Sequence, residues 1–156
     1  MPATLRHNPS LELNLVEYRG AVTLAELKAL AAFMAHNPEH LQRDTLNLIQ
    51  PGCDFNAVAL SDLDALFAYY TKLFAPLKLQ IMRRAAWVRR SMASNAPLDY
   101  WLSGDTRAAM SSTVRAFDTF AEAADWLLLN EAEMRLVERG QGFIDIARFT
   151  ASAASR

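Results

Sequence analysis

The sequence predicts a single-domain α/β protein with a mostly parallel sheet of four to five strands and helices packed on that sheet. Short apolar segments typical of strands alternate with helical segments four times along the chain, which favours parallel pairing. Three of the helical segments begin with Thr or Ser followed three residues later by an acid, the capping box of a helix N-terminus. The length of 156 residues is enough for one domain with its own core.

The first strand is predicted within residues 11–22, where leucines at every second position alternate with polar residues. An alternation with period two indicates a strand with one face less buried, at or near a sheet edge. Thr23 and Glu26 then form a capping box, which predicts a helix that ends before Pro38.

The second strand is predicted at residues 45–50, and a loop of ten residues, 51–60, follows it. A connection of this length is long for an α/β fold, where functional loops are common. The next helix has the clearest amphipathic pattern in the chain. Its capping box is expected at Ser61 and Asp64, with Ser61 as the N-cap, and Pro76 ends it.

The third strand is predicted at residues 85–90, "AAWVRR", and the fourth at 113–117, "TVRAF". Asn95 before Ala-Pro predicts the start of a short helix between them, which Gly104 ends. The stretch before residue 85 fits either the beginning of the third strand or a connection into it.

The last helix begins at the capping box of Thr119 and is expected to run to about residue 138. We therefore divide the chain into an N-terminal extension, 1–9, the α/β domain, 10–138, and a partly flexible C-terminal extension, 139–156. Within that last part, "GFIDIARF" is either a short added strand or a clip onto the domain.

Composition argues against several classes of partner. Lys plus Arg number 16 against 17 for Asp plus Glu, so no basic field attracts nucleic acid. No apolar run reaches the roughly 18 residues of a membrane span. The single cysteine, Cys53, cannot form an internal disulfide, and the N-terminus has no secretory pattern, so we expect a cytoplasmic location.

The sequence favours a non-enzymatic protein without a cofactor or metal. His36 and His40 are four residues apart, but Pro38 interrupts the helix that would place both on one face. The five glycines match neither of the phosphate-binding patterns GxGxxG and GxxxxGK[ST]. No GxSxG motif of a hydrolase is present.

The segments "LVEYRGAVTLAEL", "TLNLIQ", "ALSDLDALFAYYTKLF", "RAAWVRR" and "STVRAFDTFAEAADWL" together resemble the SpoIIAA-like branch of the STAS superfamily over residues 11–129. The most specific piece is "VRAF" followed by "EAADWL", which is similar to the closing strand and helix of that branch. The resemblance implies four helices against one side of a mostly parallel sheet. In antagonists of anti-sigma factors, a phosphorylated Ser begins the helix after the second main strand. Here that position is Leu60, one residue before Ser61, so the switch is not carried over.

Two features suggest where a binding site lies. Arginine pairs bracket "AAWV", and Arg89 and Arg90 should emerge at the carboxyl edge of the sheet beside Ser61, where an anion would meet guanidinium groups and helix N–H donors. The alternative is that such pairs only keep strand ends soluble. In the loop, Asp54 and Asn56 lie among apolar residues that either present the loop to a partner or simply anchor it in the core.

We therefore expect a STAS-like regulatory or protein-interaction domain whose partner surface is loop 51–60 and the exposed face of the following helix. The candidate residues are Asp54, Asn56, Ser61, Arg89 and Arg90. The alternative is a domain that binds a small apolar or anionic ligand in a pocket lined by Phe67, Tyr69, Tyr70, Trp87 and Trp101. A homodimer also stays open, because Tyr69 lies off the buried stripe of its helix.

Overall fold

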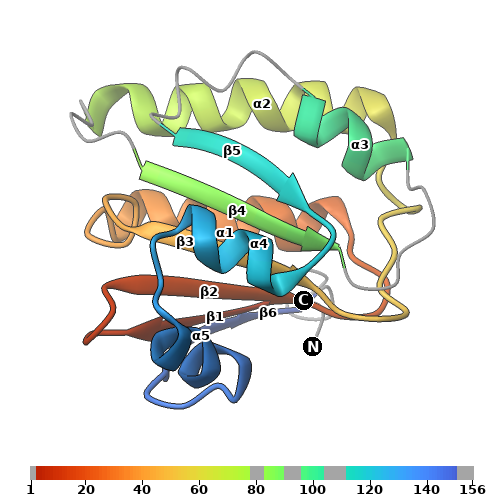
Figure 1. Ribbon diagram of the computed structural model, residues 1–156. Helices are drawn as coiled ribbons and strands as arrows, with labels where there is room; N and C mark the ends of the chain where they lie inside the picture. Colours follow the sequence, from red (N-terminus) through yellow and green to blue (C-terminus); the bar gives the residue numbers. More distant parts are fainter. Residues whose placement is uncertain (1–2, 78–82, 90–95, 104–111, 151–156) are drawn as a thin grey trace.

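A computed structural model describes residues 3–77, 83–89, 96–103 and 112–150. They form one mixed sheet of six strands with five α-helices (Figure 1). The strands are β1 (Ala3–Asn8), β2 (Leu13–Tyr18), β3 (Asp44–Ile49), β4 (Arg83–Arg89), β5 (Ser112–Phe117) and β6 (Ile144–Phe149). The helices are α1 (Leu24–His36), α2 (Leu60–Phe74), α3 (Ala96–Ser103), α4 (Phe120–Trp126) and α5 (Glu131–Glu138), with a 3₁₀ turn at Ala75–Leu77 after α2.

The sheet has the strand order β5-β4-β3-β2-β1-β6, in which β2 to β5 are parallel and β1 is antiparallel to both of its neighbours. The α/β class is confirmed, and so are the four predicted strands. The predicted total of four to five strands is wrong. Residues 1–9, assigned to an extension, supply β1, and of the two alternatives for "GFIDIARF" the structure shows a strand, β6.

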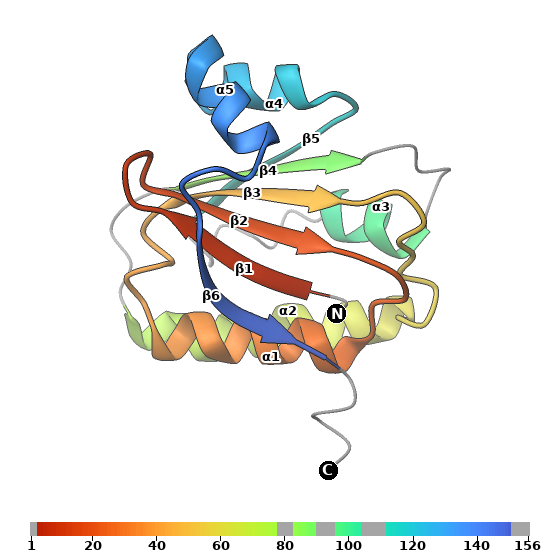
Figure 2. The same ribbon diagram turned by 90° about the horizontal axis from the view of Figure 1, so that it is seen from below.

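Helices cover both faces of the sheet, contrary to the four helices on one side that the family resemblance implies. Figure 2 shows α1 and α2 on one face and α4 and α5 on the other. The reason is the direction of the chain. From β2 to β5 each strand lies beside the one before it, whereas the chain then returns to β6 at the opposite edge. Helices α4 and α5 connect β5 to β6. Because this connection runs in the reverse direction across the sheet, a right-handed crossover places them on the face opposite α1 and α2.

Strand β2 is buried on both faces, which corrects the prediction of a strand at or near an edge. Its Leu13 and Leu15 belong to the core under α4 and α5, while Val16 and Tyr18 belong to the core under α1 and α2. Strands β1 and β3 flank it. The polar residue Asn14 between the leucines is fully buried rather than exposed, so polarity was a poor guide to exposure here.

The helix starts follow local capping chemistry. At α1 the carboxylate of Glu26 accepts a hydrogen bond from the Thr23 backbone N–H at 2.8 Å, as the capping box predicts. At α2 the prediction is wrong, because Ala59 and not Ser61 is the N-cap. Asp62 Oδ2 accepts from the Ala59 N–H at 3.0 Å, which begins the helix before Ser61.

The long last helix expected to reach residue 138 is two helices. Thr119 caps α4 as predicted, but α4 ends at Trp126, and Leu128 has the left-handed φ of 63°. Asn130 then caps α5 by accepting from the Glu133 backbone N–H at 2.8 Å. A strong N-cap inside the predicted helix favours a new start over continuation.

Candidate functional site

Loop 51–60 lies at the carboxyl edge of the parallel strands and is fixed to the core. Its backbone pairs with the chain that leaves β2, because Asp54 N–H donates to the Gly20 carbonyl at 2.9 Å and Val22 N–H donates to the Asp54 carbonyl at 3.0 Å. Three of its side chains are buried in the core: Cys53, Phe55 and Val58. The anchoring function expected as one alternative for the apolar loop residues is therefore observed.

The polar residues of this loop differ in what they do. Asp54 Oδ1 accepts a hydrogen bond from the Asn56 backbone N–H at 3.1 Å, so Asp54 shapes the turn. Asn56 and Ser61 are exposed. Burial, with the nearby Asp54, raises the pKa of the Cys53 thiol to about 11, so the thiol is protonated at neutral pH and is a poor nucleophile.

A mixed apolar and acidic surface surrounds the start of α2. Leu60 is 48% exposed, and the Tyr100 hydroxyl of α3 donates a hydrogen bond to Asp64 Oδ1, one helical turn after Leu60. That bond is the main cause that raises the pKa of Tyr100. We call this region the carboxyl-edge surface, and it consists of Asn56, Leu60, Ser61, Asp64 and Tyr100.

The predicted arginine site is not assembled by the described residues. Arg89 Nη1 is paired with Asp99 Oδ1 of α3 at 2.7 Å, beside the carboxyl-edge surface. Arg84 lies on the opposite face of the sheet, where its Nη1 donates to the Trp126 carbonyl at 3.4 Å. Arg90 lies outside the described residues.

Three of the five aromatic residues considered for a ligand pocket, Tyr70, Trp87 and Trp101, line a small cavity between the sheet and α1, α2 and α3. Its volume is about 80 Å³. Trp87 stacks on Tyr18 with ring centroids 5.3 Å apart, and Phe67 stacks on Trp101 at 4.5 Å. These rings mainly pack against one another, as core residues do.

A buried polar chain lies at the other end of the strands. Arg43 Nη1 is 2.9 Å from His7 Nε2, His7 Nδ1 is 3.0 Å from Asn14 Oδ1, and Asn14 Nδ2 donates to the His40 carbonyl at 2.7 Å. A guanidinium only donates, so His7 accepts at Nε2 and carries its proton on Nδ1. Each of the three hydrogen bonds then joins one donor to one acceptor. The buried polar chain is therefore a structural feature of the fold.

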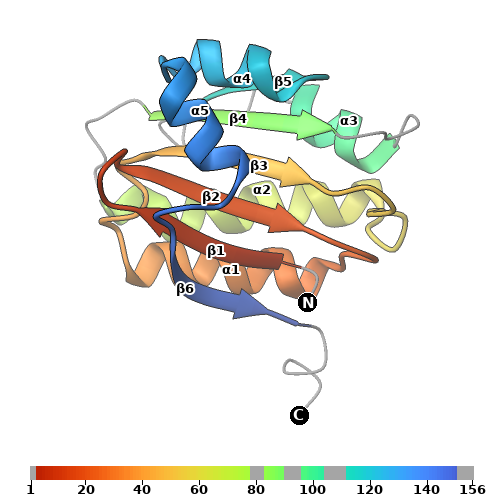
Figure 3. The same cartoon turned by 60° about the horizontal axis from the view of Figure 1, so that its bottom comes forward.

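A second, larger hollow was not predicted from the sequence. It lies on the face of β6, β1 and β2 opposite α1 and α2, and its volume is about 350 Å³. Figure 3 shows α4 and α5 over the β3 to β5 side of the sheet and no described helix in front of β1 and β6. We call it the charged groove, lined by Thr4, Leu5, Arg6, Glu17, Arg19, Asp145, Ala147 and Arg148.

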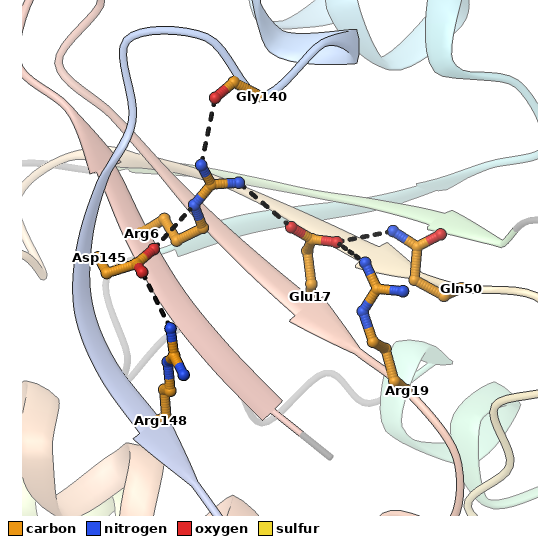
Figure 4. A network of polar contacts seen from close by, with 7 residues as sticks. All are labelled: Arg6, Glu17, Arg19, Gln50, Gly140, Asp145 and Arg148. Atoms are coloured by element: carbon orange, nitrogen blue, oxygen red, sulfur yellow. Dashed lines mark hydrogen bonds and ion pairs between the residues drawn. The ribbon is translucent and has the colours of Figure 1, made fainter. Parts of the chain in front are cut away.

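Arg6 is the centre of the charged groove (Figure 4). Its Nη2 donates to the Gly140 carbonyl at 3.1 Å, and its Nη1 lies 3.6 Å from Glu17 Oε1. Its Nε is 3.2 Å from Asp145 Oδ1, an ion pair without the alignment of a hydrogen bond. Gln50 Nε2 donates to Glu17 Oε2 at 2.8 Å and completes the network toward β3.

No group of three or more His, Cys, Asp or Glu residues in the described part of the chain could hold a metal ion. Within the same residues, no helix is long and apolar enough to cross a membrane. The chain matches no family model, no curated protein and no solved structure.

Proposed function

We propose that this chain is a non-enzymatic, STAS-like regulatory or protein-interaction domain that binds a partner protein through the carboxyl-edge surface. The observation that carries the proposal is the exposure of Leu60 at the start of a helix whose preceding loop is anchored in the core. An apolar side chain presented on a fixed backbone contacts a partner with little loss of conformational entropy. The sequential order of the parallel strands β2 to β5 supports the STAS-like part of the proposal.

Charge defines the kind of partner. The described residues around Leu60 include four acids and one arginine: Asp54, Asp62, Asp64, Asp99 and Arg89. The partner should therefore present an apolar contact surrounded by Lys or Arg. A homodimer through this surface is disfavoured, because two copies would bring like charges together. A cytoplasmic location fits the free, buried thiol of Cys53.

The alternative, an apolar ligand held between sheet and helices, has the cavity beside Trp87 in its favour. Its volume of about 80 Å³ is well below the roughly 300 to 1,000 Å³ of ordinary ligand pockets. Because the surrounding rings already stack on one another, a larger ligand would have to separate them. The geometry therefore supports the interaction surface better than an apolar ligand.

The test is affinity purification from the source cells with Leu60→Glu and Leu136→Glu variants. Leu136 on α5 is a matched control, since it is 40% exposed against 48% for Leu60 and lies on another element. We expect wild type and Leu136→Glu to retain one basic partner, and Leu60→Glu to lose it. Retention of that partner by Leu60→Glu, or no specific partner of wild type, would contradict the proposal.

A further inference from the structure

The charged groove exists because a small residue lies between long ones. In the sheet register, Thr4 of β1 is directly opposite Glu17 of β2 on one side and Arg148 of β6 on the other. Arg6 follows on the same face of β1, two residues along. The short Thr4 side chain forms the floor, and the longer side chains form the walls of a hollow of about 350 Å³.

The charges of the groove alternate along a chain that ends in arginine on both sides. Arg148 pairs with Asp145 at 3.1 Å, Asp145 with Arg6 at 3.2 Å, Arg6 with Glu17 at 3.6 Å, and Glu17 with Arg19 at 2.9 Å (Figure 4). Three arginines and two carboxylates leave an excess of one positive charge in this groove, although the whole chain has a net charge of −1. The groove is therefore a local positive site.

The two outer arginines are more exposed than the arginine between them. The side chains of Arg19 and Arg148 are 60% and 57% exposed, whereas those of Arg6 and Glu17 are 25% and 12% exposed. In each outer arginine the ion pair is made by Nη2, and a guanidinium has five N–H donors in all. The inner carboxylates hold the outer guanidinium groups at the rim, with further N–H groups available to a ligand.

We propose that the charged groove binds a phosphate group, either as inorganic phosphate or as the phosphate of a small phosphomonoester. Guanidinium groups match phosphate oxygens in geometry and charge, and here they come from β1, β6 and the end of β2. The hydroxyl of Thr4 adds a donor at the floor. The volume of about 350 Å³ lies within the range of small-ligand sites, roughly 300 to 1,000 Å³, so the organic part of an ester also fits.

This site is separate from the carboxyl-edge surface, which lies around α2 and α3 on the other face of the sheet. Failure of partner capture by Leu60→Glu therefore says nothing about phosphate, and the reverse also holds. The competing explanation for the groove is a purely structural clip between β6 and β1. A clip makes the same ion pairs but gives no preference for phosphate over other anions.

Isothermal titration calorimetry of the full chain at constant ionic strength tests the proposal with inorganic phosphate, glycerol 3-phosphate and acetate. Arg19→Gln and Arg148→Gln remove the outer arginines. Arg135→Gln is the matched control, because Arg135 is also 60% exposed and paired with one carboxylate, Glu131, at 2.6 Å, but lies on α5 outside the groove. Circular dichroism and thermal unfolding verify that each variant folds.

We expect both phosphates to bind more tightly than acetate, with affinity that falls as salt is raised. Arg19→Gln and Arg148→Gln should each weaken phosphate binding about tenfold or more, and Arg135→Gln should leave it unchanged. Tighter binding of glycerol 3-phosphate identifies a phosphomonoester as the ligand, and equal binding identifies free phosphate. Binding no tighter than acetate, or equal affinity in the groove variants and wild type, overturns the proposal.

A measurement on wild type alone covers the case in which a groove variant does not fold. In ¹H–¹⁵N spectra, phosphate should shift the backbone amides of Thr4, Arg6, Glu17 and Ala147, which line the groove. The amide of Arg135 should not move. Shifts confined to residues outside the groove would exclude it as the binding site.

Discussion

Replacing Asn14 by alanine should lower the free energy of unfolding by about 2–5 kcal/mol. Asn14 is fully buried on the interior strand β2 and connects His7 and His40, which are themselves buried. Its Oδ1 accepts from His7 Nδ1 at 3.0 Å, and its Nδ2 donates to the His40 carbonyl at 2.7 Å. The variant removes both bonds and leaves both partners in place.

The magnitude follows from those two partners. A buried donor or acceptor that loses its hydrogen bond costs roughly 1–3 kcal/mol, so His7 and His40 together give about 2–6 kcal/mol. A water that enters the space left by the Asn14 side chain would hydrogen-bond to one of these groups. This lowers the upper end of the expected loss of stability to about 5 kcal/mol. The change is a large part of the roughly 5–15 kcal/mol that stabilises a typical domain.

Urea unfolding followed by tryptophan fluorescence measures the change. Gln42→Ala is the control, because Gln42 is exposed and lies two residues after His40 in the sequence. Its free energy of unfolding should stay within about 0.5 kcal/mol of wild type. Asn14→Asp separates hydrogen bonding from packing, because it keeps the volume but places an acceptor opposite the His40 carbonyl. We expect Asp to destabilise at neutral pH. If Asn14→Ala and Asn14→Asp both lie within 1 kcal/mol of wild type, the buried polar chain is not a stabilising structure.

Two further predictions concern pH and backbone strain. Burial is the main cause that lowers the pKa of His40, against the opposing effect of Glu39. As the pH falls through about 6.5, the unfolded chain therefore takes up a proton before the folded one, and the free energy of unfolding should decrease until His40 is protonated in the folded state as well. Urea midpoints at pH 7.5 and 5.5 should thus differ more in wild type than in His40→Gln, and equal differences would refute this. Leu128 has a φ of 63° and is exposed, so Leu128→Gly should raise the free energy of unfolding by up to about 1 kcal/mol in the same assay, whereas a loss of stability would contradict the predicted relief of backbone strain.

The parts of the fold that depend on neighbouring residues were predictable from the sequence. Thr23 and Thr119 begin their helices as expected, because a capping residue acts within three positions of itself. Ser61 failed by the same local rule, since Asp62 offers a competing bond to Ala59. Strand β1 was missed because its six residues, "ATLRHN", contain only two apolar side chains, and strand periodicity needs a longer run to be visible.

The charged groove could not be predicted, because its residues meet only through strand pairing between the two ends of the chain. Thr4, Glu17 and Arg148 lie in one row across β1, β2 and β6, and β1 was assigned to an extension. Each residue alone is an ordinary polar position on a strand. Arg89 and Arg90 were proposed as a site because they are adjacent in the sequence, but successive side chains of a strand point to opposite faces, and Arg90 lies outside the described residues. Two residues that are adjacent in a strand are therefore not expected to converge on one site.

The attachment of β6 favours a ligand over a clip as the reason for the charged groove. Asp145 and Arg148 are mostly exposed, and exposed ion pairs contribute about 1 kcal/mol or less. Strand β6 is held instead by its backbone pairing with β1 and by Phe149, which is buried and meets Phe33 of α1 edge-on at 5.9 Å. Since these contacts fasten the strand without help from charge, the two outer arginines are not needed for the fold, and their position on the lining of one hollow agrees with the proposed phosphate site.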